Sequence, residues 1–96
     1  AYYVVEAVNQ KGKKEYIWLP DGKGKSFVKS ANEVWSKEKV QQFVNSHLHP
    51  KKLIDIRLGV EENIPIWEIA FIDQKGRYTF YDLRFDGKDW LKNIHL

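Results

Sequence analysis

The strongest constraint on the fold of this 96-residue chain is an internal repeat of turns. Two tripeptides, Gln-Lys-Gly and Asp-Gly-Lys, occur twice in the same order, at residues 10–12, 21–23, 74–76 and 86–88. The copies are offset by 64 residues at the first turn and by 65 at the second, and one residue of slippage in a loop costs little. Unrelated hairpins also share Gly, Asn and Asp in their turns. The common order of both turns nevertheless predicts a duplication relating residues 2–30 to residues 66–94.

The strands are predicted by alternation of apolar and polar side chains. In residues 54–58, three aliphatic side chains alternate with Asp55 and Arg57, a pattern typical of a half-buried strand. We expect Gly59 to Asn63 to end this strand and turn the chain. Further strands are expected in the second unit at residues 65–73, 77–85 and 89–94, and in the first unit at residues 2–9, 14–20 and 26–30.

The central strand of the second unit is apolar on both faces. Trp67, Ile69 and Phe71 share one face, and Ile66 and Ile72 lie on the other. A sheet that is wet on one side does not need this pattern. We therefore expect cover on both faces, with Trp67 in the core.

One helix is predicted at residues 36–48. Ser36 is a good N-cap, and Trp35 before it is placed to act as a hydrophobic staple. Val40, Phe43, Val44 and Leu48 then form an apolar stripe, and the segment ends before Pro50.

These elements predict an α+β fold in which an antiparallel sheet packs with one helix, as a tandem repeat with the first unit incomplete. Residues 1–32 form a partial first unit of three strands. Residues 33–96 form a second unit of one helix and four strands. The helix and first strand missing from the first unit are expected upstream of Ala1, which is not a translation start.

Composition narrows the function classes. The chain has no Cys, which excludes disulfides, zinc–thiolate sites and thiol catalysis. Its net charge is only +3, and no recognition helix or RNA-binding signature is present, so we expect no nucleic-acid partner. No apolar run reaches the roughly 20 residues of a membrane span.

No motif indicates catalysis, a metal or a cofactor. The pair His47 and His49 lies at a helix end, where the side chains diverge, and His95 is isolated. Glu61-Glu62 is expected in a solvated hairpin tip, and Gly22-Lys23-Gly24-Lys25 lacks the context of a phosphate loop. We therefore expect no enzyme activity, no catalytic residues, no cofactor and no small-molecule substrate.

Five residues are candidates for partner binding. Trp18 and Trp90 lie on strands that flank the two Asp-Gly-Lys turns, at equivalent ends of the two units. Exposed aromatic side chains of that kind anchor interfaces. The alternative is that both fill space between the two units. Lys11, Lys13 and Lys14 cluster at a predicted loop tip, where they serve solubility or attract an anionic cell-wall polymer or membrane surface.

Several segments together resemble the YpmB/TseB-like family of Gram-positive bacteria, within the wider PepSY-like group. Two of these segments are residues 65–69 and 90–94. The most specific part is Trp67-Glu68 after a short hairpin, together with the terminal Leu91-Lys92-Asn93-Ile94. The resemblance covers nearly the whole chain in order, although Trp90 stands where a smaller residue is expected. The other segments that carry it are residues 2–5, 16–20, 36–40 and 78–85.

The resemblance implies a cystatin-like fold built from tandem PepSY-like units, on the extracytoplasmic face of the cell membrane behind an N-terminal transmembrane anchor. It implies a regulator or adaptor that associates with a class B penicillin-binding transpeptidase in cell-wall elongation. The alternative is an inhibitor or modulator of an extracellular peptidase, for which fold similarity alone argues.

Overall fold

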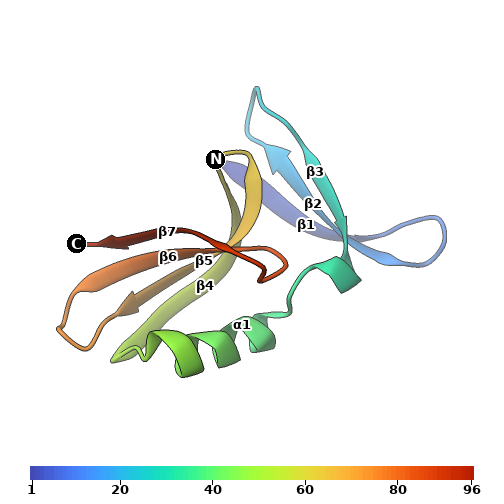
Figure 1. Cartoon of the computed structure of the whole chain (residues 1–96). Helices are drawn as coiled ribbons and strands as arrows, with labels where there is room; N and C mark the ends of the chain where they lie inside the picture. Colours follow the sequence, from blue (N-terminus) through green and yellow to red (C-terminus); the bar gives the residue numbers. More distant parts are fainter.

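The computed structural model describes all residues, 1–96, as two antiparallel sheets and one helix (Figure 1). The first sheet has the order β1-β2-β3 and the second the order β4-β5-β6-β7. The elements follow in the order β1 (Tyr2–Val8), β2 (Lys14–Pro20), β3 (Phe27–Ser30), the 3₁₀ turn η1 (Ala31–Glu33), α1 (Lys37–Phe43), the π turn η2 (Val44–Leu48), β4 (Lys52–Glu61), β5 (Ile64–Ile72), β6 (Tyr78–Arg84) and β7 (Trp90–His95).

Strand pairing repeats between the two sheets. Tyr3 pairs with Leu19 in the first sheet, and Trp67 pairs with Leu83 in the second. All seven pairs of β1 with β2 have a counterpart in β5 and β6 at an offset of 64 residues. Both sheets thus share one register, although their common origin stays a prediction.

The first turn of each unit is built by the same hydrogen bonds. The Oδ1 atom of Asn9 accepts from the backbone N–H groups of Lys11 and Lys13, at 2.9 and 3.0 Å. The Oδ1 atom of Asp73 accepts from those of Lys75 and Arg77, at 2.9 and 2.8 Å. A short polar side chain that closes a turn onto its own backbone is the reason that Asn and Asp favour such positions.

The helix begins and ends as expected. The Oγ atom of Ser36 accepts from the N–H of Lys39 at 3.1 Å, which satisfies one of the free donors of the first turn. His49 leaves the helical conformation with a φ of 47°, directly before Pro50.

The helix buries one face of the second sheet. Val40 and Val44 are fully buried, and across from them Trp67, Ile69 and Phe71 are 6%, 0% and 4% exposed. These five side chains belong to one apolar cluster, so the prediction of Trp67 as a core residue is confirmed.

Trp18 joins the two sheets. It is completely buried, belongs to the same cluster as the helix-side core, and lies 6.5 Å from Phe85 between ring centroids. The two units therefore share one core, which positions the first sheet relative to the second.

Both predicted bounds of the strand at residues 54–58 are wrong, because β4 begins at Lys52. The strand β4 does not end at Gly59 but continues to Glu61, which pairs with Ile64. Glu62 and Asn63 alone make the turn, with φ values of 51° and 63°. A two-residue hairpin turn with two positive φ angles matches the twist of the flanking strands. The other strands agree with the predicted ones to within one residue at each end.

None of the helices has the length and apolar character needed to cross a membrane.

Candidate interaction surface

The lysine cluster lies at the tip of the β1–β2 hairpin. Lys11 and Lys13 form no ion pair in the structure. Lys14 contacts Glu6 across the strands, with 2.8 Å between Nζ and Oε1, and this hydrogen bond raises the pKa of Lys14. The tip thus carries two free cations and one that its own sheet neutralises.

The two candidate tryptophans are not equivalent. The shared register places Trp18 at the position of Asp82 in the middle strand, whereas Trp90 begins β7 at the edge of its sheet. Trp18 is 0% exposed and is therefore wrong as a surface anchor; it fills the core between the sheets. Its indole N–H has no hydrogen-bond partner. Trp90 is 57% exposed and remains a candidate.

Trp90 is supported by other aromatic rings. Its ring centroid lies 6.2 Å from that of Tyr81, which lies 6.0 Å from that of Phe43. Phe43 in turn lies 6.1 Å from Trp35. We call these four residues the aromatic row. It runs from the helix to the edge strand, and only its outer member, Trp90, is largely exposed.

The aromatic row is held in place on both sides. Tyr81 is 8% exposed, and burial together with the charge of Asp89 raises the pKa of its hydroxyl. The Asp89 carboxylate also accepts from the backbone N–H of Trp90 at 2.9 Å. The sequence pattern predicted Trp90 as a candidate and Phe43 only as part of the apolar stripe of the helix, and it gave no sign of Tyr81. Contacts between a helix and a strand leave no local pattern.

Lys11 and Lys13 do not join Trp90 in one site. The lysines lie at the tip of the β1–β2 hairpin in the first sheet, and Trp90 begins β7 in the second (Figure 1). A partner that used both would have to span the two units.

A row of charged side chains crosses the face of the second sheet opposite the helix. Arg57, Glu68, Asp82 and Lys92 pair in sequence from β4 to β7. The guanidinium of Arg57 contacts Glu68 at 2.7 Å. Asp82 is 5% exposed, and burial, with the nearby charges of Glu68 and Glu61, raises its pKa to about 6. Alternation had predicted only the outward position of Arg57.

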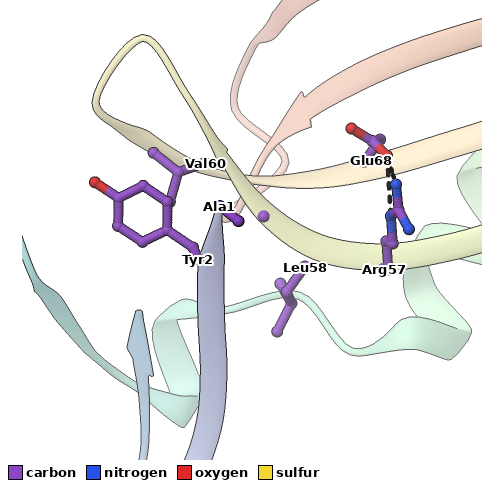
Figure 2. A pocket seen from close by; sticks show the side chains of 7 residues that line it. Ala1, Tyr2, Arg57, Leu58, Val60 and Glu68 are labelled. Carbon is purple, nitrogen blue, oxygen red and sulfur yellow. Dashed lines mark hydrogen bonds and ion pairs between the residues drawn. The ribbon is translucent and has the colours of Figure 1, made fainter. Parts of the chain in front are cut away.

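A shallow hollow of about 500 Å³ separates β1 from β4. Figure 2 shows Tyr2 beside Val60, Leu58 on the lower wall, and Arg57 directed toward Glu68 rather than into the hollow. The two charged side chains at this site therefore pair with each other.

Comparison with known proteins assigns the chain to a family. It is 33% identical over 94 residues to the "Probable cell wall elongation regulator TseB" of Bacillus subtilis (strain 168). The solved structure of the YpmB protein from Bacillus subtilis superposes with a TM-score of 0.86 at 32% identity, over 99% of this chain and 75% of that one. The chain belongs to the YpmB/TseB-like family. No family model matches it.

Membership in the YpmB/TseB-like family confirms the predicted resemblance and the α+β fold. The match with TseB covers 97% of this chain but only 58% of the length of TseB. The cystatin-like and PepSY-like descriptions, and the division at residues 32 and 33, stay predictions.

Proposed function

We propose that this chain is a non-catalytic regulatory domain of cell-wall elongation that acts by binding another protein. The proposal is supported by its similarity to TseB, whose name describes a regulator. As partner we propose a class B penicillin-binding transpeptidase. The domain would then lie on the extracytoplasmic face of the cell membrane, held by an N-terminal anchor.

The exposure of Trp90 is the observation that supports the proposed contact surface. It is 57% exposed, rests against the buried Tyr81, and begins an edge strand. Tryptophan is enriched among the residues that dominate binding energy. An edge strand also offers unpaired backbone N–H and C=O groups to a partner. The proposed interface is therefore the start of β7, with Trp90 as its anchor.

Lys11 and Lys13 have a secondary part in this proposal. Exposed cations without partners raise the rate of encounter with an acidic surface more than they raise affinity. The same charges would give weak contact with an anionic wall polymer or membrane surface. Lys14 contributes less, because Glu6 neutralises it at 2.8 Å.

Binding of a Trp90→Ala variant to the soluble domain of the transpeptidase tests the proposal. We expect affinity to fall about thirty-fold or more, as for other central aromatic anchors. Tyr3→Ala is the matched control, since Tyr3 is also exposed, at 61%, but lies on the first sheet. A Lys11→Glu, Lys13→Glu variant should mainly slow association.

The outcomes separate the parts of the proposal. A folded Trp90→Ala variant with unchanged affinity would move the interface away from β7. Loss of binding in Tyr3→Ala alone would place the interface on the first sheet. No measurable binding of the unaltered chain would contradict the transpeptidase as partner.

A further inference from the structure

A cluster of five ionisable side chains ties the two edges of the second sheet together. Its members are Arg57, Glu61, Glu68, Asp82 and Lys92. Glu61, near the end of β4, contacts Lys92 of β7, with 3.3 Å between Oε1 and Nζ. These strands are the first and last of the sheet order. Such a contact requires a strongly coiled sheet, in which the end of the β4–β5 hairpin bends over the face opposite the helix.

Asp82 lies within this cluster without a partner of its own. It is 5% exposed and forms no ion pair or side-chain hydrogen bond in the structure. In the register it stands directly between Glu68 of β5 and Lys92 of β7. The ammonium of Lys92, the residue paired with Asp82 on β7, is held by Glu61 instead.

The remaining charges nearby are already paired. Arg57 of β4 contacts Glu68 at 2.7 Å, and Arg84, two residues further along β6, contacts Asp86 at 3.4 Å. The cluster therefore contains one free carboxyl group. Lys92 is paired with Glu61 and lies opposite Asp82 in the register, so two carboxyl groups compete for it.

We propose that the proton on Asp82 decides which carboxylate holds Lys92, and thereby whether the end of the β4–β5 hairpin is tied to β7. When Asp82 is neutral, Glu61 is the only carboxylate that pairs with Lys92, and this ion pair holds the hairpin end to β7. With Asp82 ionised, a buried anion directly opposite Lys92 draws the ammonium away, since an unpaired buried charge is costly. The hairpin end is then released.

The transition falls in a mildly acidic range. Burial is the main cause that raises the pKa of Asp82 to about 6, followed by the charges of Glu68 and Glu61. The charge of Lys92 lowers this pKa and offsets part of the rise. The hairpin is therefore tied at pH 5 and released at pH 7.5. Because Leu58 and Val60 of this hairpin line the hollow beside Tyr2 (Figure 2), its release loosens the contact between the two sheets.

Amide hydrogen exchange of the intact chain tests this device. After correction for the intrinsic exchange rate, protection of the hairpin-end amides of Glu61 and Ile64 should fall about two- to five-fold between pH 5 and pH 7.5, as expected for loss of one exposed ion pair. The turn amide of Gly76, at the other end of β5, should not change.

Three variants make the result specific. Asp82→Asn should keep the hairpin protected at both pH values, and Glu61→Gln should leave it less protected at both. Glu62→Gln, which alters the neighbouring turn carboxylate, should behave as the unaltered chain does. Unchanged protection in the unaltered chain, or the same pH dependence in Asp82→Asn, would overturn the proposal.

A titration of the Asp82 carboxyl carbon by NMR gives a second readout that does not depend on stability. Glu61→Gln removes a repelling charge and frees Lys92, so both effects should lower the titration midpoint of Asp82. A midpoint that stays the same in Glu61→Gln would show that the two carboxyl groups do not compete, and would equally overturn the proposal.

Discussion

The indole N–H of Trp67 donates a hydrogen bond to the backbone carbonyl of Trp35, at 3.1 Å. Trp67 lies in the central part of β5, and Trp35 directly precedes the helix N-cap. The backbone N–H of Trp35 donates to the carbonyl of Phe85 at 2.9 Å. Both backbone groups of Trp35, its N–H and its carbonyl, are therefore hydrogen-bonded to residues of the second unit. These two bonds fix the start of the helix on the core.

Replacing Trp67 with Ala should destabilise the chain by roughly 3–5 kcal/mol. The side chain is 6% exposed and packs in the cluster beneath the helix. A loss of this size is a large fraction of the stability of a small domain. Urea unfolding followed by circular dichroism measures it. A free energy of unfolding within 1 kcal/mol of the unaltered chain would contradict the assignment of Trp67 to the core.

Trp67→Phe and Trp18→Phe form a matched pair. Both remove the same volume from a buried site, but Trp67 loses a hydrogen bond and leaves the Trp35 carbonyl unpaired. Trp18 loses an indole N–H that has no partner. A buried polar group without a partner costs about 1–3 kcal/mol, so Trp67→Phe should be the more destabilising change by roughly 2 kcal/mol. Equal losses would mean that neither N–H affects stability.

The sequence could predict the strands because turn chemistry is local. Asn9 and Asp73 close their turns with bonds to residues two and four positions away, so the pattern that specifies them is visible in a short window. The helix was predictable for the same reason, since Ser36 caps its own first turn.

Exposure could not be predicted in the same way. Leu19 and Leu83 occupy the same register position, yet Leu19 is 41% exposed and Leu83 is 2% exposed. The helix covers only the second. Likewise, Trp18 precedes one Asp-Gly-Lys turn and Trp90 follows the other. Only Trp18 is buried, where it packs against Phe85 of the other unit. Burial depends on contacts between elements that are distant in the sequence, which alternation within a strand does not encode.

Gly87→Ala should destabilise the chain more than Gly12→Ala. A Cβ atom at Gly87 would overlap the indole ring of Trp35, while one at Gly12 would meet nothing. The φ angles are similar, 73° and 75°, so the conformational strain is shared and the comparison isolates the overlap. We expect the free energies of unfolding of the two variants to differ by about 1–3 kcal/mol, as for other overpacked sites. Melting temperatures of the two variants measure it, and equal values would show that Trp35 moves aside freely.

Asp82→Asn should raise stability at neutral pH and leave it unchanged in acid. The pKa of Asp82 is raised to about 6 in the folded chain, from 3.8. The folded state therefore binds the proton more tightly than the unfolded state does, and this contribution to stability is complete below pH 3.8 and lost as the pH rises through about 6. An amide resembles the neutral carboxyl group and has no such loss.

Melting temperatures of both proteins between pH 4 and pH 8 measure this effect. The difference between them cancels the titration of groups that do not interact with Asp82, and it should be small at pH 4 and grow to a nearly constant value above about pH 7. Glu62→Gln, in the exposed turn, is the control and should follow the unaltered chain throughout. A variant that is less stable at pH 7.5 would mean that the pairing of ionised Asp82 with Lys92 more than offsets the cost of burying the Asp82 charge, contrary to the raised pKa.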